Sequence, residues 1–234
     1  MMSDNTIYFT ETQIKDIYNS KVKKPNDYFS RQLPKCPVKM WNYNWRNRDA
    51  PRCFCLLDFI IWINKYNLNT IKTLNITCTG DPELEFINAE KINVYSYLYE
   101  TNTENDLHKL ANKEKCDFFL FNQTIEHLYN PLLAVKNIYN NLNDNGYVFT
   151  SVPTVVIPHD TPFHFANWTP MGLAMLFSSA GFEIKEIGYW GNLNYIHNAY
   201  GKVHDFPDIF KCGSHNEEAN PCGCWILAQK VVPL

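Results

Sequence analysis

Short apolar runs alternate with amphipathic stretches over most of the chain. Six runs have the length and pattern of β-strands, at residues 72–78, 91–98, 117–121, 147–152, 182–187 and 224–229. The run at 117–121 is continuously apolar, as expected for a strand that is buried on both faces of a parallel sheet. The stretches between the later runs have helical spacing, so strands and helices are predicted to alternate along the chain.

Two predicted helices carry clear start signals. Asn130 and Thr169 are N-cap candidates, and each is followed by a proline, which fits the first position of a helix. Apolar residues then recur at helical spacing, and Gly146 and Gly181 are predicted to end the two helices. A further helix is predicted over 53–66, where the sequence is apolar on most faces.

The alternation of elements predicts an α/β protein with a doubly wound, mainly parallel sheet. Residues 53–234 are expected to form this domain. Residues 1–52 are expected to form an N-terminal extension of helix and loop. Within the extension, residues 40–48 mix aromatic, amide and arginine side chains. This segment is interpreted either as a lid or acceptor-binding wall, or as a clamp that packs the extension onto the sheet.

The overall composition is that of a globular protein, with 45% hydrophobic and 19% charged residues among 234. The net charge is −3, but residues 1–52 contain ten basic and five acidic residues. This excess indicates a solvated surface or a small anionic partner, and it is too weak to predict nucleic-acid binding. There is no apolar run of membrane-spanning length and no signal-peptide pattern, so we expect a cytoplasmic protein without membrane contact.

Eight cysteines in a reducing compartment are expected to be free thiols. One set near the C-terminus offers a zinc-site alternative: Cys212, His215, Cys222 and Cys224. The spacing of this set matches no common zinc module, so ordinary thiols are the favoured interpretation.

Ionisable and amide side chains follow two of the predicted strands. They are Asn122, Gln123, Glu126 and His127 after the run at 117–121, and His159, Asp160 and His164 after the run at 147–152. In open α/β sheets, ligands bind outside the carboxyl ends of the strands. These residues are therefore the candidates for chemistry.

Three short segments carry a resemblance to a known family. They are FNQTIEHL at 121–128, LNDNGY at 142–147 and AGF at 180–182. Together they resemble the C-terminal half of class I S-adenosylmethionine-dependent methyltransferases of the type 11-like group, over about residues 70–230. The resemblance implies a Rossmann-like sheet of about seven strands with the last strand antiparallel.

The resemblance also implies where the cofactor S-adenosylmethionine binds. The implied residues are Thr77, Thr79, Gly80 and Asp81 after the first strand, Glu100 for the ribose, Asp106 near the adenine, and Asn122 and Gln123 near the methionine end. Thr77 and Thr79 stand where the family usually has glycine, whose missing Cβ lets the cofactor approach closely. We therefore expect weaker cofactor binding than in members with a glycine-rich loop.

The implied function is methyl transfer to the hydroxyl of a sugar or another small molecule. The layout from His164-Phe165 through Trp168 to Trp190-Gly191-Asn192 is similar to that of methyltransferases associated with glycan modification. The partner would then be a small-molecule or glycan hydroxyl acceptor, and the sequence specifies no oligomeric state. Two alternatives are a ribose or phenol methyltransferase, and an inactive protein of this fold that serves as a partner or scaffold.

Two arrangements can remove the proton of an acceptor hydroxyl. In the first, His159 or His164 acts as a general base oriented by Asp160, with His127 close by. In the second, Glu126, His127 and His164 bind a divalent cation. This set is similar to one in small-RNA 2′-O-methyltransferases, although Gln123 replaces an acidic residue and so weakens the case for magnesium. Both arrangements remain open at the level of the sequence.

Overall fold

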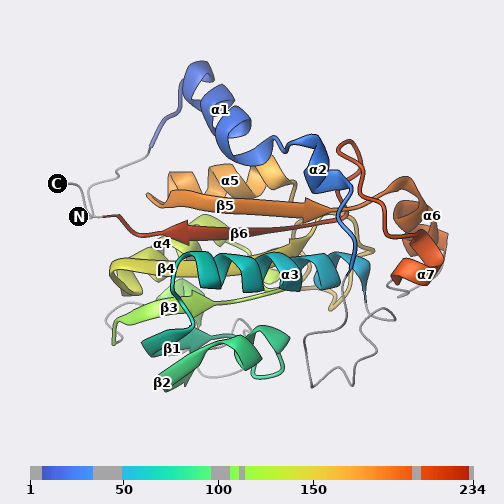
Figure 1. The fold of residues 1–234 in the computed structure, drawn as a ribbon. Helices are drawn as coiled ribbons and strands as arrows, with labels where there is room; N and C mark the ends of the chain where they lie inside the picture. The colour runs from blue at the N-terminus through green and yellow to red at the C-terminus, as the bar shows by residue number, and fades with distance from the viewer. Residues whose placement is uncertain (1–6, 34–48, 96–105, 111–113, 202–206, 232–234) are drawn as a thin grey trace.

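A six-stranded sheet lies at the centre of the residues that the computed structural model describes, which are 7–33, 49–95, 106–110, 114–201 and 207–231. The strand order is β2-β1-β3-β4-β6-β5 (Figure 1). The strands are β1 (Thr70–Ile76), β2 (Asn88–Val94), β3 (Cys116–Leu120), β4 (Leu142–Pro153), β5 (Glu183–Trp190) and β6 (Gly223–Gln229). The pairs β1–β2, β1–β3 and β3–β4 are parallel, whereas β6 is antiparallel to both β4 and β5.

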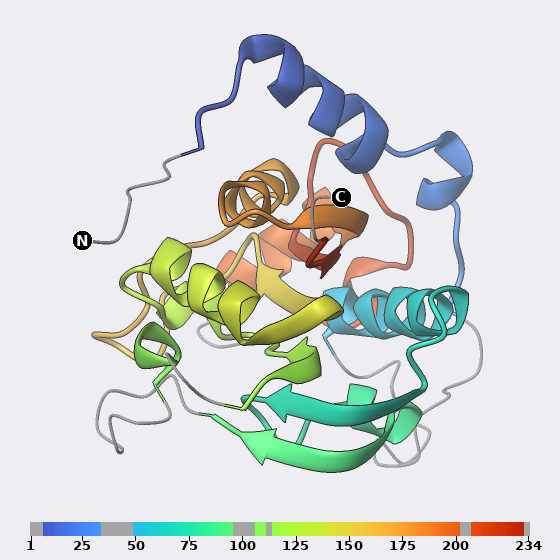
Figure 2. The ribbon, with the colours of Figure 1, turned by 90° about the vertical axis from the view of Figure 1, so that its left-hand side faces the viewer.

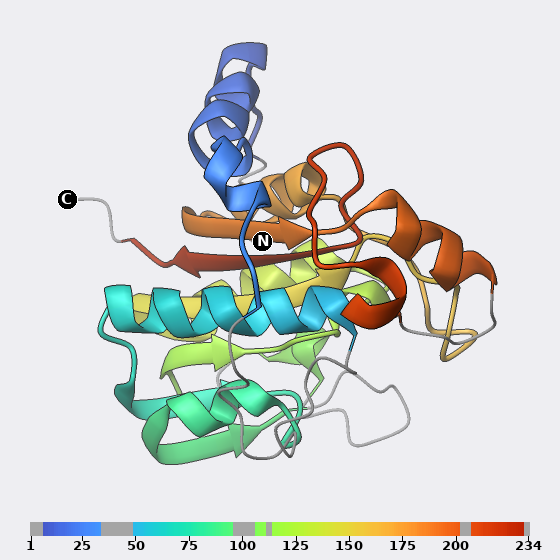
Figure 3. The same cartoon turned by 45° about the vertical axis from the view of Figure 1, so that its right-hand side comes forward.

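The prediction of a doubly wound, mainly parallel α/β fold is confirmed. A strand is present at each of the six predicted places, although β4 begins five residues before its expected start at 147. The predicted end of the second strand, 96–98, lies outside the described residues. The described residues contain six strands where about seven were expected. The last strand is antiparallel, and it lies between β4 and β5. The segment between β5 and β6 contains α6 (Leu193–Gly201) and α7 (Ile209–Cys212), and both lie at the end of the sheet where β5 finishes (Figure 3). Because β6 starts from that same end, it runs antiparallel to β5.

Helices cover both faces of the sheet. The helix α3 (Ala50–Lys65) packs on one face, and α4 (Pro131–Asn141) and α5 (Pro170–Ser179) pack on the other (Figure 2). Strand periodicity produces the two cores, because successive side chains point to opposite faces. Phe118 of β3 faces the core beneath α3, and the next residue, Phe119, faces the core beneath α4 and α5.

The predicted helix caps are present. The Asn130 side chain accepts a hydrogen bond from the Leu133 amide at 3.2 Å, and Thr169 accepts one from the Gly172 amide at 3.0 Å. Gly181 has a φ of 97°, a conformation that favours glycine, and it turns the chain from α5 into β5.

Two predicted helix bounds differ from the structure: the end of the helix that follows Asn130, and the start of the helix predicted over 53–66. The helix α4 ends at Asn141, and Gly146 lies inside β4, because β4 already pairs with β3 from Leu142 onward. A Cβ on Gly146 would lie 2.8 Å from the Asn143 carbonyl oxygen, so close packing within the strand explains this glycine. The helix α3 begins at Ala50, so the proposed division at residue 52 falls in its first turn; the domain assignment itself stays a prediction.

The N-terminal extension packs against the edge strand β5. It contains α1 (Glu11–Ile17), a π-helical turn η1 (Tyr18–Val22) and α2 (Asn26–Phe29). The Tyr28 hydroxyl accepts a hydrogen bond from the Tyr189 amide at 2.8 Å and lies 3.0 Å from the Tyr189 carbonyl oxygen. Arg31 pairs with Asp58, a buried residue of α3. The extension therefore covers a backbone edge that would otherwise be open to pairing. The aromatic segment 40–48 lies outside the described residues.

Replacing Tyr28 with phenylalanine should destabilise the protein, because it leaves the buried Tyr189 backbone groups without their side-chain partner. We expect the free energy of unfolding to fall by about 1–3 kcal/mol in urea titration. Tyr8→Phe is the matched control, since the Tyr8 side chain is 85% exposed. Equal stability of the two variants would contradict this role of Tyr28.

Candidate functional site

Polar side chains meet at the carboxyl ends of β1, β3 and β4. The Thr77 amide donates to the Leu120 carbonyl oxygen at 3.2 Å, and the hydroxyls of Thr77 and Thr124 lie 3.1 Å apart. The Asn122 amide nitrogen donates to a carboxylate oxygen of Asp81 at 3.1 Å. The structure thus brings together the turns that follow β1 and β3. It also directs the Thr77 hydroxyl toward Thr124.

Arg52, in the first turn of α3, connects these turns to β4. Its guanidinium group donates to both carboxylate oxygens of Glu83, at 2.9 and 3.1 Å. It also donates to the Ser151 hydroxyl at 3.0 Å, and Ser151 in turn donates to the Asn122 side-chain oxygen at 2.9 Å. A single side chain therefore fixes α3, the turn after β1, and the ends of β3 and β4 relative to one another.

The charges in this network do not balance. Asp81 and Glu83 are both buried, and Arg52 is the cation next to them. Burial and the neighbouring Glu83 raise the pKa of Asp81 to about 7, against the lowering effect of Arg52. When both carboxylates are ionised, the group carries an excess negative charge, which favours a cationic ligand.

The remaining predicted cofactor residues lie as follows. Gly80 is exposed, and a Cβ on it would meet only the Cys78 sulfur, at 3.7 Å. Gln123 has a φ of 48° and donates from its side chain to Ser151 at 3.2 Å. Asp106 is buried and accepts a hydrogen bond from the His108 amide in the 3₁₀ turn η4 (Leu107–Lys109). Thr79 is exposed, and Glu100 lies outside the described residues.

The three candidate catalytic histidines come together. His127 ends the 3₁₀ turn η5 (Ile125–His127), and His159 and His164 belong to the loop between β4 and α5. The ring centroids are 5.0 Å apart for His127 and His159, 5.7 Å for His127 and His164, and 4.6 Å for His159 and His164. Asp160 has a carboxylate oxygen 3.9 Å from Nε2 of His127.

The backbone of Glu126 holds the loop between β4 and α5, which carries His159 and His164. Its carbonyl oxygen accepts hydrogen bonds from the amides of Phe165, at 2.7 Å, and Ala166, at 3.4 Å. Its side chain is fully buried, and neither carboxylate oxygen has a hydrogen-bond partner among the described residues. Burial therefore raises the pKa of Glu126 to about 8. One of its oxygens lies 4.0 Å from Nε2 of His127, so Glu126 lies beside the histidines.

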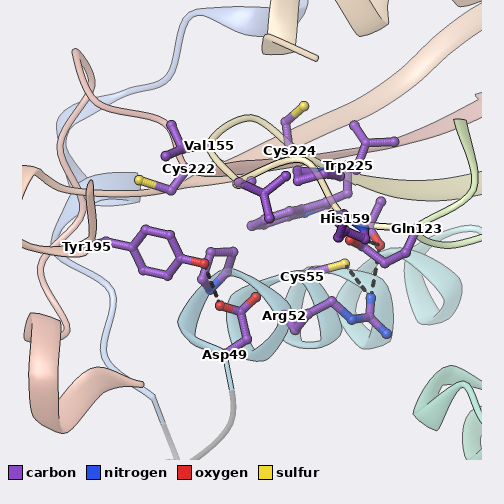
Figure 4. Close-up of a pocket in the computed structure, with 16 residues that line it drawn as sticks. Asp49, Arg52, Cys55, Gln123, Val155, His159, Tyr195, Cys222, Cys224 and Trp225 are labelled. Carbon is purple, nitrogen blue, oxygen red and sulfur yellow. Dashed lines mark hydrogen bonds between the residues drawn. The ribbon is translucent and has the colours of Figure 1, made fainter. Parts of the chain in front are cut away.

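A cavity opens next to this network (Figure 4). The start of α3 forms one wall, with Asp49, Arg52 and Cys55. The end of β4 and the start of β6, including Trp225, form the opposite side. The polar residues of the lining are Asp49, Arg52, Gln123, Ser151, His159 and Tyr195. The cavity thus offers polar groups beside an aromatic and aliphatic surface, which is the usual character of a small-molecule site.

The Asp49–Tyr195 pair closes one end of the cavity. The Tyr195 hydroxyl donates to the Asp49 carboxylate at 2.7 Å. Burial raises the pKa of Asp49 to about 6, against the lowering effect of the Tyr195 hydrogen bond. Burial and the neighbouring Asp49 raise the pKa of Tyr195, so the tyrosine keeps its proton.

The sequence interpretation missed Arg52, Glu83 and Ser151. Arg52 and Asp58 are charged residues within or next to an apolar helical stretch, and this contrast was an available signal. Their partners are far away in sequence: Arg52 and Ser151 are 99 positions apart. Local pattern alone therefore could not identify the pairing.

Other sequence candidates have structural roles. Trp190 is fully buried and stacks on Phe54 with the centroids 5.2 Å apart, so it belongs to the core. Cys212 and Cys222 lie in the core beneath α3, whereas Cys224 lies in the opposite core. His215 pairs with Glu217 at 3.0 Å. The predicted alternative of a zinc site at this set does not form, and the cysteines of the described part of the chain are free thiols.

The chain belongs to the family described as a methyltransferase domain, which matches residues 32–187, about two thirds of its length. Comparison with curated protein sequences gives no significant match. None of the described helices has the length and apolar character that a membrane crossing requires.

Solved structures show the same fold at low sequence identity. A Galdieria sulphuraria protein described as a sarcosine dimethylglycine methyltransferase is 11% identical, with a TM-score of 0.53, over 77% of this chain and 85% of its own. The [4+2]-cyclase SpnF is 15% identical, with a TM-score of 0.51, over 77% and 82%. A Haloferax volcanii methyltransferase in complex with the activator Trm112 is 13% identical, with a TM-score of 0.50, over 81% and 96%.

Family membership supports S-adenosylmethionine as the cofactor, and the donor set at the ends of β1 and β3 fits it. The cofactor carries a sulfonium and an ammonium group, and the excess negative charge of Asp81 and Glu83 over Arg52 suits a cation. The space around Gly80 is open to a ligand. In doubly wound folds of this kind, the turn after the first strand usually leads into an α-helix. Here the turn after β1 leads into a 3₁₀ turn, η3 (Pro82–Phe86).

The raised pKa of Asp81 predicts a pH-dependent stability. The folded protein holds this proton more firmly than the unfolded chain does, whose aspartate pKa is near 3.8. The stabilisation is therefore complete below about pH 4 and is lost as the pH rises through about 7.

Asp81→Asn keeps an acceptor for Asn122 and removes the titration. We expect the free energy of unfolding of this variant, relative to that of the wild type, to increase by on the order of 1 kcal/mol as the pH rises from 5 to 8. Chemical denaturation at a series of pH values measures this difference. Asp16→Asn, at an exposed position, is the control and should show no such pH-dependent gain. A pH-independent difference for Asp81→Asn would contradict the assignment.

Proposed function

We propose that the protein is an S-adenosylmethionine-dependent O-methyltransferase that acts on a sugar or another small hydroxyl compound. The observation that carries this proposal is the position of the histidine cluster. His127 belongs to the 3₁₀ turn that follows the turn after β3, and His159, whose ring centroid is 5.0 Å from that of His127, lines the cavity. Methyl transfer to oxygen needs a site for the departing hydroxyl proton, and imidazoles are suited to accept it.

The cofactor is proposed to bind at the turns after β1 and β3. Gly80 leaves room for it, Asp81 faces its cationic end, and Asn122 fixes Asp81 in place. Gln123 is held by Ser151 at the boundary between these turns and the cavity, so we assign it to the methionine end. Thr77, Thr79, Glu100 and Asp106 stay proposed cofactor residues on the strength of the family resemblance.

The cavity is proposed to hold the acceptor. S-adenosylmethionine supplies an electrophilic methyl group and leaves as S-adenosylhomocysteine after the acceptor oxygen has displaced its sulfur. Arg52, Ser151 and Asp49 offer hydrogen bonds to hydroxyl groups, and Trp225 offers an apolar face to a sugar ring. His159 accepts the hydroxyl proton, with His127 and His164 as its ring neighbours and Asp160 beside His127 as the remaining members of the catalytic set.

A glycan acceptor is the preferred identity within this class, because of the sequence layout around His164 and because the cavity combines many polar groups with an indole. A ribose or phenol acceptor would use the same proton chemistry. The structural similarity to a cyclase illustrates that this fold also supports other activities. A scaffold without catalysis is disfavoured because it does not require buried ionisable groups beside an open cavity.

Cofactor binding is tested by calorimetric titration with S-adenosylmethionine and with Gly80→Val. The free protein has room for the valine side chain, so its melting temperature should stay within about 2 °C of the wild type. The cofactor dissociation constant should rise by at least about tenfold, because the added methyl groups occupy the proposed binding space. Unchanged affinity in Gly80→Val, or no heat with the wild type at millimolar cofactor, would refute this site.

Catalysis is tested with a panel of sugar, ribose and phenol hydroxyl acceptors, by measuring S-adenosylhomocysteine formation. His159→Ala should lower turnover by about two to four orders of magnitude and leave cofactor affinity nearly unchanged. His197→Ala, at an exposed position on α6, is the matched control and should keep wild-type turnover. Normal turnover in His159→Ala would eliminate the proposed role of this residue.

A further inference from the structure

We propose that His127, His159 and His164 form a binding site for a divalent transition metal. One ring nitrogen of each residue lies within 4.8 Å of the other two. Among the described residues, this is the one group of histidine, cysteine and acidic side chains with such an arrangement. The donor set contains His159, which the sequence-based cation site did not include, and it consists entirely of imidazoles.

Hydrogen bonds fix the tautomer of each ring. Nδ1 of His127 lies 3.0 Å from the Phe163 carbonyl oxygen, and Nδ1 of His159 lies 3.3 Å from the Ile157 carbonyl oxygen. A carbonyl oxygen only accepts, so both Nδ1 atoms carry the hydrogen. The unprotonated nitrogen of each ring is therefore Nε2, whose lone pair can bind a metal.

His164 has the opposite tautomer. Its Nε2 lies 2.9 Å from the side-chain oxygen of Asn167. The Asn167 amide nitrogen donates to the Val156 carbonyl oxygen at 3.2 Å, which fixes the orientation of this side chain. Nε2 of His164 is therefore the donor and Nδ1 is unprotonated. This Nδ1 is buried and has no hydrogen-bond partner among the described residues, which is a costly state for a polar atom unless a ligand binds it.

The pattern is the one that metal-binding histidines show. Such residues donate the second ring N–H to a carbonyl or carboxylate oxygen, which orients the ring and makes the other nitrogen a better ligand. Here all three rings have an oxygen acceptor of this kind, in Phe163, Ile157 and Asn167. Each of the three rings is therefore oriented by its own hydrogen bond, and each keeps one unprotonated nitrogen that can bind a metal.

The chemistry of the donors selects the metal. Imidazole nitrogens suit zinc, iron, cobalt and nickel, whereas magnesium and calcium prefer oxygen ligands. In a tetrahedral zinc site the nitrogens would be about 3.4 Å apart. The cluster would therefore contract on binding, and two of its three members lie on the loop between β4 and α5, where such a movement is possible. Three protein ligands leave a fourth position open, as catalytic zinc sites do.

The location links the metal to the acceptor. His159 lines the cavity, so the open position can face a bound hydroxyl group. A metal there would lower the pKa of that hydroxyl, so that its proton could pass to solvent. With its Nε2 bound to the metal, His159 would no longer accept the proton itself, so the metal would replace this part of the proposed mechanism. This role of the metal in deprotonating the acceptor rests on the proposed function. The binding of the metal itself does not.

The test is a titration of the metal-free full-length protein with zinc, followed by cobalt(II) substitution and absorption spectroscopy, in the absence of cofactor and acceptor. We expect one metal ion per chain and a cobalt spectrum without thiolate charge-transfer bands. His159→Ala and His164→Ala should each raise the zinc dissociation constant by at least about 100-fold. His197→Ala is the control and should bind as the wild type does.

Asn167→Ala provides a variant that keeps all three ligands. It removes the acceptor that orients His164, so we expect a rise in the zinc dissociation constant of about tenfold. The inference is overturned if zinc does not bind, if neither histidine variant weakens binding, or if the cobalt spectrum shows thiolate coordination. A protein that binds zinc at these residues and fails to bind S-adenosylmethionine would retain this inference and lose the proposed function.

Discussion

The buried ion pair between Arg52 and Glu83 holds the candidate site together. Arg52 belongs to the first turn of α3, Glu83 follows β1, and the Ser151 hydroxyl that Arg52 also contacts lies near the end of β4. Removing one member of a buried pair leaves an uncompensated charge and typically costs about 3–5 kcal/mol. The contact therefore constrains the relative positions of three elements that are remote in sequence, and the cavity lies among them.

The site divides into two electrostatic environments. The turns after β1 and β3 contain more buried carboxylate than cationic charge, which favours a cationic ligand. The loop after β4 contains the imidazoles of His159 and His164, which meet His127 beside the cavity. Gln123 and Ser151 both line the cavity, and the Gln123 side chain donates a hydrogen bond to the Ser151 hydroxyl at 3.2 Å. This arrangement agrees with the proposed reaction, in which a cationic methyl donor meets a hydroxyl that must lose its proton.

Much of the fold could be predicted from the sequence because its signals are local. Strand periodicity, the proline after Asn130 and the glycine after α5 act within a few residues, and the structure confirms them. Gly146 misled the prediction because its sequence neighbours resemble a helix end, whereas close contacts within β4 require it. The confirmed parts of the prediction are therefore those in which local pattern and tertiary structure agree.

The site was less predictable, because its decisive contacts connect distant residues. The sequence placed the histidines at the same edge of the sheet but left open which of them meet. Nor did the sequence indicate that the Thr77 hydroxyl lies 3.1 Å from that of Thr124. Arg52 was assigned to the extension because the helix was predicted to begin at 53. No local pattern marks its partners Glu83 and Ser151, which lie 31 and 99 residues away.

A crystal structure of the protein with S-adenosylhomocysteine bound is the most direct test of the account. We expect the ligand to contact the turn at Gly80 and Asp81 and the turn at Asn122 and Gln123, with its sulfur directed toward the cavity that His159 lines. Arg52 should keep its contacts with Glu83 and Ser151 in the complex. A ligand bound elsewhere, or one whose sulfur is separated from the cavity by the Arg52 network, would contradict the account.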